Sequence, residues 1–412
     1  MTDSERIEMN EQVIVEPKTE DSVKIDQNRC SRCLVCPSVC PYDAIAVEEK
    51  TGEVRLNMEK CQVCGICSSA CPASAIDTIY YNVDSLIGYI NKRMTERNSD
   101  KLVLTCRGSS PFQVQRMNEV AKFQADNFLS ISLPCVGRVP SELILKALAS
   151  KAKKIIVMPC EDKYCRFKDG SKIDTRRLLL TQALLFQLGF KPDTLTITKR
   201  SNKAQIDSNK CVGCGNCNYV CPYDAITMGT SKVPKLDPIA CTGCGDCVAV
   251  CPALAVKLDG FEYETISEAI RDYGSSVPKM KRETKKPVIL VLSCQWSEFS
   301  DLDAYGNGTM ENVVFAGIPC AGRADTLHVL EALHQGFDGV LITACKKGEC
   351  KLEEGNDRAE EHVASLKNLL AQVKLEGRVD MCFVSPKNVG DLNDHIRKFM
   401  EKIEELHKKE VV

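Results

Sequence analysis

Apolar residues in two parts of the chain gather into short continuous runs that alternate with segments of helical spacing. Runs that are apolar throughout are typical of strands buried on both faces of a parallel sheet. The segments between them repeat apolar residues three and four positions apart, which predicts amphipathic helices. Toward the end of the chain the predicted strands are 287–294, 313–320, 339–345 and 379–386, and the predicted helices are 324–336 and 358–375.

The same order of elements is predicted in the first half of the chain. Strands that alternate with helices in this way favour an α/β domain with a parallel sheet covered on both faces. We therefore predict two such domains. In the first, the strands are 101–106, 128–135, 154–160 and 193–198, and the helices are 140–150 and 175–190.

Two segments have no such pattern. Residues 1–24 are polar and acidic, and we expect them to form a disordered tail. The basic segment PKMKRETKKP at 278–287 is expected to be a solvated linker.

Charge and hydropathy exclude several classes of protein. Lys and Arg (54) nearly balance Asp and Glu (56) over 412 residues, so no strong field favours nucleic acid or an anionic membrane. The longest apolar runs, such as 178–190, are too short to span a bilayer. The polar N-terminus has no signal-peptide pattern. We predict a cytoplasmic protein without a membrane span.

Cysteine is the exception in this composition, with 25 residues. A disulfide framework would require a secretory signal and usually a short chain, and neither is present. Cysteines at short regular spacing in a cytoplasmic protein instead predict metal ligands.

Twenty-four of the 25 cysteines occur in pairs separated by 180 to 188 residues, which indicates a tandem duplication. Cys382 has no counterpart, and we interpret it as an apolar strand residue rather than a ligand. Each unit divides into a cysteine-rich α+β part, like a ferredoxin, and an α/β part. The predicted organisation is a tail at 1–24, ferredoxin domains at 25–82 and 206–262, and α/β domains at 83–205 and 263–412.

Four segments match the pattern Cys-x2-Cys-x2-Cys-x3-Cys-Pro of bacterial ferredoxins, which carry two 4Fe–4S clusters. Three closely spaced thiolates bind one cluster, and the fourth binds the neighbouring cluster. Zinc is the alternative, but it usually takes cysteine pairs separated by longer loops. The predicted ligand sets are Cys30, Cys33, Cys36 and Cys71; Cys61, Cys64, Cys67 and Cys40; Cys211, Cys214, Cys217 and Cys251; and Cys241, Cys244, Cys247 and Cys221.

Each α/β domain adds four cysteines that the ferredoxin pattern does not explain. Three of them end predicted strands, and the carboxyl ends of parallel strands line the crevice where ligands bind. The fourth follows the third in Cys-x4-Cys. Four convergent thiolates favour an iron–sulfur cluster, structural zinc is the alternative, and a redox dithiol or disulfide is less favoured. The sets are Cys106, Cys135, Cys160 and Cys165 in the first unit, and Cys294, Cys320, Cys345 and Cys350 in the second.

The second α/β domain contains the segments CQW (294–296), PCAGR (319–323), GVLITACKKGEC (339–350) and Gly355-Asn356. They resemble the delta, iron–sulfur subunit of methyl-viologen-reducing hydrogenase of methanogenic archaea. The resemblance covers about 288–400 and, more distantly, 101–200. It implies a 2Fe–2S cluster, and transfer of electrons from a hydrogenase or formate dehydrogenase to heterodisulfide reductase.

Three residues depart from the pattern of that family. Ser297 stands where the family usually has a cysteine after the tryptophan. Lys346 and Glu161 stand where it usually has histidine. The four matched cysteines are nevertheless kept in both units, which favours a bound group in both.

Motifs for substrate chemistry are absent from the sequence. No Gly-x-Gly-x-x-Gly follows a strand to open a helix, so flavin or nicotinamide binding has no support. We predict a non-catalytic electron-transfer subunit of an oxidoreductase complex, with four 4Fe–4S clusters and two 2Fe–2S clusters. It would relay electrons between a donor (hydrogenase, formate dehydrogenase or ferredoxin) and a heterodisulfide-reductase-like complex. The alternative is a component that supplies electrons for assembly or activation of a metallocofactor enzyme.

Overall fold

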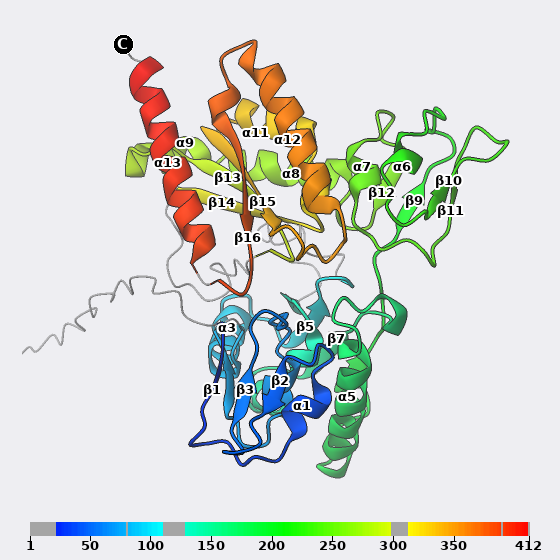
Figure 1. Cartoon of the computed structure of the whole chain (residues 1–412), viewed down its shortest axis with the longest axis vertical. Helices are drawn as coiled ribbons and strands as arrows, with labels where there is room; N and C mark the ends of the chain where they lie inside the picture. Colours follow the sequence, from blue (N-terminus) through cyan, green and yellow to red (C-terminus); the bar gives the residue numbers. More distant parts are fainter. Residues whose placement is uncertain (1–21, 80, 110–127, 298–311, 389, 411–412) are drawn as a thin grey trace, which may run out of the picture.

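The computed structural model describes residues 22–79, 81–109, 128–297, 312–388 and 390–410. Two parallel sheets flanked by helices, and two smaller parts made of short strands, are visible in Figure 1. The predicted tail lies almost wholly outside the described residues. Within them, no helix is long and apolar enough to cross a membrane.

Each α/β region contains a four-stranded parallel sheet, and all eight predicted strands are present. The strand orders are β6-β5-β7-β8 and β14-β13-β15-β16. The chain therefore leaves β5 and β13 in one direction and returns on their other side, which creates a switch point at the carboxyl ends. The strands are β5 (Lys101–Cys106), β6 (Phe128–Leu133), β7 (Lys154–Met158), β8 (Leu195–Ile197), β13 (Ile289–Cys294), β14 (Val313–Ile318), β15 (Gly339–Cys345) and β16 (Val379–Val384).

Helices cover both faces of the second sheet. On one face α11 (Thr326–His334) and α12 (Gly355–Ala371) pack against strand residues such as Leu290. On the other face α13 (Asp391–Glu410) packs against Ile289 and its neighbours. Helix α13 was not predicted, whereas α11 and α12 were.

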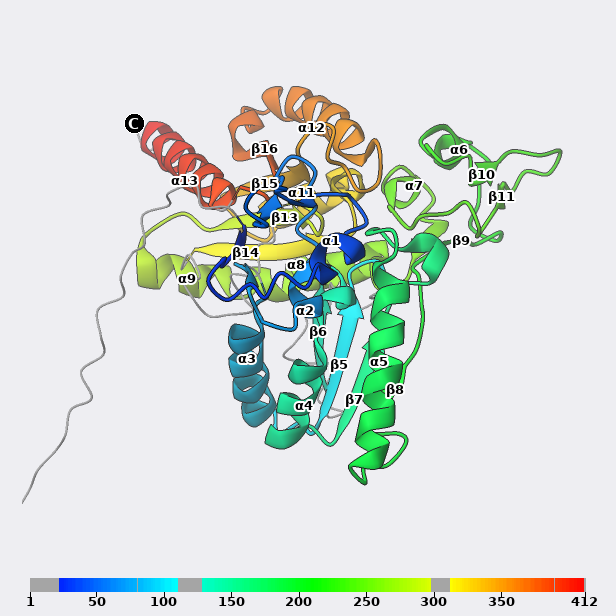
Figure 2. The same ribbon diagram turned by 60° about the horizontal axis from the view of Figure 1, so that its bottom comes forward.

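The first sheet has helices on one face in the described part of the chain. This face is covered by α3 (Val83–Glu96), α4 (Ser141–Ser150) and α5 (Gly170–Gln187), which Figure 2 shows next to the strands of the first sheet. No described helix covers the opposite face, because the chain passes from β8 directly to the second ferredoxin region without a counterpart of α13. The prediction of cover on both faces is therefore correct for the second sheet only, among the residues described.

The predicted linker at 278–287 is wrong. Its residues lie mostly in a helix, α9 (Val277–Thr284), that follows α8 (Tyr263–Gly274). Pro278 stands at the start of this helix, where proline is favourable. Val277 is buried in the core of the second α/β region. Lys281 also forms an ion pair with Asp338 at 2.8 Å. Lys279, Lys281 and Arg282 therefore lie on a helix rather than in a linker, although most side chains of the segment are exposed, as predicted.

Two short antiparallel strand pairs form each ferredoxin region, and a short helix carries the third cysteine of each of the four cysteine loops. These small elements build little core of their own, so the cysteine loops pack against the neighbouring α/β regions. The pairs are β1 (Val23–Ile25) with β4 (Ile76–Thr78), β2 (Ile45–Val47) with β3 (Val54–Leu56), β9 (Ala204–Ile206) with β12 (Val256–Leu258), and β10 (Ile226–Thr227) with β11 (Lys235–Leu236). The helices are α1 (Val35–Val39), α2 (Ile66–Ala70), α6 (Asn216–Tyr219) and α7 (Asp246–Ala249).

The two units pack against each other through the carboxyl-terminal edges of their sheets. Figure 1 shows the first unit and the second α/β region meeting along this side. The Phe167 and Trp296 rings meet edge to face there, with centroids 5.9 Å apart. The edge that holds the extra cysteines is therefore also the contact between units.

Candidate iron–sulfur sites

Each ferredoxin loop passes through a left-handed residue just before the short helix that carries its third cysteine. Gly65, Gly215 and Gly245 hold this position with φ of 79°, 81° and 92°, and Leu34 holds it in the first loop with φ of 61°. Glycine adopts this conformation freely, whereas a residue with a Cβ loses about 1–2 kcal/mol. All four loops therefore follow the same backbone path. In the first loop this path is unfavourable for Leu34, because leucine has a Cβ and glycine does not.

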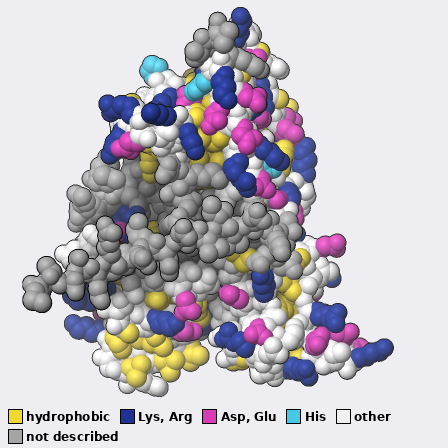
Figure 3. All heavy atoms as spheres, turned by 90° about the vertical axis from the view of Figure 1, so that its left-hand side faces the viewer, with side chains coloured by type: hydrophobic (Ala, Val, Ile, Leu, Met, Phe, Trp, Pro, Cys, Tyr) yellow, Lys and Arg dark blue, Asp and Glu magenta, His cyan; other side chains and the backbone are white. Residues whose placement is uncertain are grey.

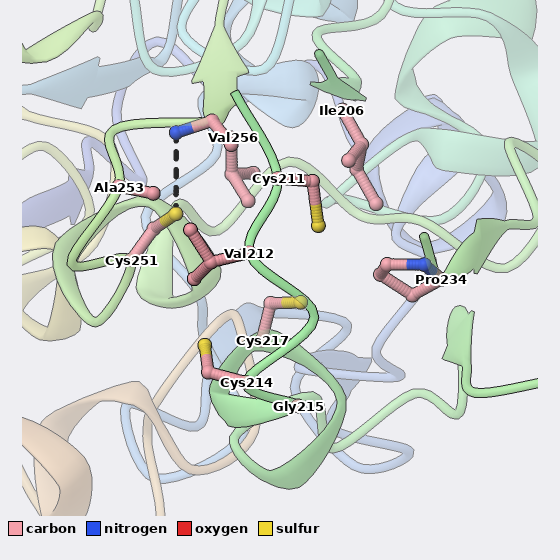
Figure 4. A pocket seen from close by; sticks show the side chains of 11 residues that line it. Ile206, Cys211, Val212, Cys214, Gly215, Cys217, Pro234, Cys251, Ala253 and Val256 are labelled. Atoms are coloured by element: carbon pink, nitrogen blue, oxygen red, sulfur yellow. Dashed lines mark hydrogen bonds between the residues drawn. The ribbon is translucent and has the colours of Figure 1, made fainter. Parts of the chain in front are cut away.

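Four small pockets lie at the cysteine loops of the ferredoxin regions. Each is lined by one of the four predicted ligand sets, with three cysteines from one loop and the fourth from the other. Figure 4 shows one of them, formed by Cys211, Cys214, Cys217 and Cys251. The structure thus brings together every cross-loop set that the sequence predicts.

Backbone N–H groups point at several of these sulfur atoms. Ala75 N lies 3.3 Å from Cys71 Sγ, and Ala255 N lies 3.2 Å from the equivalent Cys251 Sγ. Hydrogen bonds to sulfur stabilise the thiolate form and tune an iron–sulfur cluster. The donor set and its surroundings fit 4Fe–4S clusters.

The extra cysteines converge at the switch point of each sheet, as predicted. In the second unit, Sγ of Cys294 and Sγ of Cys345 are 3.8 Å apart. Two thiolates bound at about 2.3 Å to one tetrahedral metal ion would be separated by about that distance. We call this set (Cys294, Cys320, Cys345, Cys350) the second thiol site, and the equivalent set (Cys106, Cys135, Cys160, Cys165) the first thiol site.

Glycines make room for the sulfur atoms of both thiol sites. A Cβ on Gly355 would lie 2.0 Å from Cys320 Sγ, and a Cβ on Gly170 would lie 2.8 Å from Cys135 Sγ. Amide donors are close as well, since Val136 N is 3.2 Å from Cys106 Sγ. Among the described residues, no group of three or more His, Cys, Asp or Glu side chains is already arranged around a single metal ion. What the two sites share is four buried or half-buried thiols with amide donors around them.

The four thiols of the second site influence one another strongly. Contact with the Cys320 thiol, and then with the Cys345 thiol, lowers the pKa of Cys350 to about 2. Contact with Cys294 raises the pKa of both Cys320 and Cys345 well above the ordinary value. Close contact among the four thiols therefore moves their pKa values apart, whereas a metal cluster would bind all four as thiolates.

Two buried carboxyl groups near these sites were missed by the sequence reasoning. Asp246 is 1% exposed, and desolvation raises its pKa to about 7; Asp174 is 0% exposed, and desolvation raises its pKa as well. Neither carboxyl has a hydrogen-bond partner among the described residues. A Cβ on Gly322, beside Cys320, would lie 2.4 Å from Asp246 Oδ1. The residue equivalent to Asp246 in the first unit is Ile66. This difference between the repeats is the feature of the sequence that could have drawn attention to Asp246.

Each thiol site is tied to the ferredoxin region of its own unit by an arginine of the Gly-Arg pair. Arg323 is fully buried and donates to the carbonyl of Phe261 at 3.1 and 3.2 Å. Arg138 donates to the carbonyl of Val63, between two cysteines of the second loop, at 3.3 Å. Ferredoxin region and thiol site are therefore packed as one body within each unit.

Ferredoxin-type regions for 4Fe–4S clusters joined to parallel α/β sheets define an iron–sulfur protein of the electron-transfer class. The chain belongs to the family described as methyl-viologen-reducing hydrogenase, delta subunit, whose model matches residues 102–213 and 289–407. Models for 4Fe–4S dicluster domains match 22–72, 204–258 and 233–295. The two family matches are consistent with a duplication.

Two kinds of relative resemble this chain. The vhu iron-sulfur subunit of the F420-non-reducing hydrogenase of Methanocaldococcus jannaschii is 32% identical over 124 residues, which is 29% of this chain and 92% of the relative. One subunit of the ferredoxin:CoB-CoM heterodisulfide reductase of Methanosarcina mazei is 31% identical over 207 residues, which is 49% of this chain. This match spans only a quarter of the reductase subunit's length.

Proposed function

We propose that this chain is an iron–sulfur electron-transfer subunit that relays electrons between a donor enzyme and a heterodisulfide-reductase-like complex. One observation carries the proposal: each of the four pockets in the ferredoxin regions is lined by one complete cysteine set. The donor would be a hydrogenase, a formate dehydrogenase or a ferredoxin. The names of the relatives, an iron-sulfur subunit of a hydrogenase and a subunit of a heterodisulfide reductase, support both ends of this relay.

The ligand assignments are part of the proposal. Sixteen cysteines would hold four 4Fe–4S clusters in the sets named above, and the two thiol sites would each hold a 2Fe–2S cluster. When bound, these clusters accept and release single electrons. The chain contributes the thiolates, the amide donors and the glycine space that keep each cluster in place. The units would be 25–205 and 206–412, each with its ferredoxin and α/β domains divided at 82 and 262.

We place the protein in the cytoplasm, without nucleic acid as a partner. Its net charge is −2. Figure 3 shows Lys and Arg side chains intermixed with Asp and Glu over the upper part of one face. Mixed charge supports docking by local complementarity to a protein partner rather than by attraction to a polyanion.

Anaerobic purification followed by iron, sulfide and zinc analysis tests the cofactor content. Four 4Fe–4S and two 2Fe–2S clusters predict about 20 iron atoms per chain and no zinc. Cys382→Ala is the matched control, because Cys382 is buried in β16 outside all six sets, and this variant should retain the full iron content. About 16 iron atoms with about two zinc atoms would overturn the assignment of the thiol sites.

The relay itself is tested by reducing the purified chain with a hydrogenase under hydrogen, and then adding a heterodisulfide-reductase complex. Reoxidation of the clusters coupled to disulfide reduction is the expected result. Reduction without reoxidation, together with electron delivery to a metallocofactor enzyme undergoing activation, would instead support the alternative function.

A further inference from the structure

Residues of the two units that are equivalent in sequence contact each other in space. Arg107 and Gln295 are separated by 188 residues, the same offset as Cys106 and Cys294, and Arg107 Nη1 donates to the carbonyl of Gln295. A contact between a residue and its own counterpart occurs at the two-fold axis of an isologous interface. The two units thus pack like the halves of a symmetric dimer, with the axis beside the first cysteine of each thiol site.

The next equivalent pair, Gly108 and Trp296, also meets at this axis. The position of a Cβ on Gly108 lies 3.9 Å from Trp296 Cζ2 and 3.1 Å from Cys160 Sγ. The indole of the second unit therefore lies against Gly108, whose other close neighbour is a sulfur of the first thiol site. Contacts with Cys320 and Cys345, and with the backbone N–H of Trp296, lower the pKa of Cys294 well below its ordinary value, although burial acts to raise it. The ring of Trp296 thus meets the first unit at Gly108, next to Cys160, while its backbone N–H contacts Cys294 of the second thiol site.

Further contacts cross the interface in a symmetric pattern. Arg166 follows the fourth cysteine of the first thiol site and donates to the carbonyl of Thr242, which follows Cys241 in the other unit's ferredoxin region. The equivalent Lys351 of the second unit donates to Gln62 Oε1, beside Cys61. Each thiol site is therefore in contact with the ferredoxin region of the opposite unit.

Burial separates the ferredoxin cysteines into inner and outer sets. Cys61, Cys64, Cys241 and Cys244, from the second loops, are buried. The arginines of the thiol sites, Arg138 and Arg323, pack against these loops at Gly65 and Gly245. Cys33 and Cys214, from the first loops, are exposed, although the third cysteine of each first loop, Cys36 or Cys217, is buried. We call the second-loop sets inner and the first-loop sets outer, because each first-loop set has one cysteine exposed at the surface.

We propose that the two units form one continuous electron path, which crosses from the first thiol site to the second beside Trp296 and ends at the two outer ferredoxin sites. This inference rests on the proposed function, because it requires clusters at the thiol sites. Each crossing moves one electron, so that the site in one unit is oxidised and the site in the other is reduced by one electron, with no bond formed or broken. Trp296 is a positioning residue that fills the gap between the two sites.

Magnetic interaction between the two thiol sites tests whether they are neighbours. Cys160→Ser removes the first site and Cys345→Ser removes the second, so each variant reports the EPR spectrum of one reduced site alone. We expect the fully reduced native chain to show splitting or broadening that the sum of the two variant spectra lacks. A native spectrum equal to that sum would overturn the inference. Absence of iron from either thiol site in the native chain would overturn the proposed cofactor assignment as well, which distinguishes the two failures.

The role of Trp296 is tested by Trp296→Leu. The variant should keep its iron content and both EPR signals, while electron equilibration between the thiol sites, followed by freeze-quench after partial reduction, slows several-fold. The control is Phe337→Leu, which also removes a buried aromatic ring but lies about 25 Å from Cys345 at the other end of β15. If Trp296→Leu and Phe337→Leu equilibrate at the native rate, Trp296 has no part in the crossing. If both slow equally, the effect of Trp296→Leu reflects general loosening and the positioning role is refuted.

Discussion

The space beside Cys320 gives the sharpest test of the second thiol site. Gly355 begins α12, and a Cβ at this position would lie 2.0 Å from Cys320 Sγ, where ordinary contact begins at about 3.4 Å. In Gly355→Ala the sulfur or the helix must therefore move by more than one ångström. Metal–ligand distances tolerate only about 0.2 Å. We expect the variant to lose the cluster of the second thiol site.

Alanine substitutions at three glycines of the chain should give iron losses of different size. Overpacking a buried position costs about 1–3 kcal/mol of unfolding free energy, so Gly355→Ala should fold while losing about two of about 20 iron atoms. Gly170→Ala, at 2.8 Å from Cys135 Sγ, should have a weaker effect on the first site. Gly88 in α3 has no atom within 4 Å of an added Cβ, and Gly88→Ala should stabilise the helix by about 1 kcal/mol.

Iron analysis, EPR of the reduced protein and thermal unfolding of all three variants provide the measurements. The expected order of iron loss is Gly355→Ala, then Gly170→Ala, then none for Gly88→Ala. Full iron and an unchanged EPR signal in Gly355→Ala would refute the assignment of Cys320 as a ligand held against α12. Loss of all cluster signals in Gly355→Ala, with Gly88→Ala intact, would show that the second thiol site is required for folding of the whole chain.

Three further outcomes are expected. Cys345→Ser should abolish one 2Fe–2S EPR signal and leave the four 4Fe–4S signals, whereas loss of all signals would mean that the domain only supports folding. Burial lowers the pKa of His328 to about 3, although its Nε2 lies 3.0 Å from the carbonyl of Tyr263. Because the unfolded imidazole binds its proton near pH 6.5 and the folded one does not, unfolding free energy should fall by up to about 1.4 kcal/mol per pH unit below pH 6.5. His328→Asn should remove this slope in denaturant titrations at pH 7 and pH 5.5, and an unchanged slope would contradict the assignment. Arg323→Lys should cost about 1.5–3 kcal/mol in denaturant titration, because lysine cannot replace both hydrogen bonds to Phe261, and native stability would show that this anchor is dispensable.

The parts of the fold that follow from local pattern could be predicted. Continuous apolar runs such as 339–345 are found as central strands because only a sheet buried on both faces accommodates them. The convergence of Cys294 and Cys345 followed from their place at strand ends, since parallel strands finish at a common edge.

The parts that depend on packing between distant segments could not. The charge-rich segment after 277 does not indicate that Val277 is buried in the core of the second α/β region. Helix α9 was therefore predicted as a linker. Asp246 occupies one of the unspecified positions of a ferredoxin motif. Ile66 stands at the equivalent place in the first unit, but this difference alone does not show that Asp246 lies close to Cys320. The contact of Arg107 with Gln295 depends on how two folded units dock, which spacing along the chain does not encode.

The pairing of Gly108 with Trp296 has a consequence for how such a protein could arise. A homodimer of identical single units would place the same residue on both sides of its axis, so two indoles or two glycines would face each other. Two indoles would overfill the space and two glycines would leave it empty. Joining the copies in one polypeptide frees each half to mutate separately, so that a large side chain on one side can be matched by the absence of a side chain on the other. Covalent linkage thus permits an asymmetric interface between the two units. A homodimer of one gene product could not form such an interface, because both subunits would carry the same residue at each position.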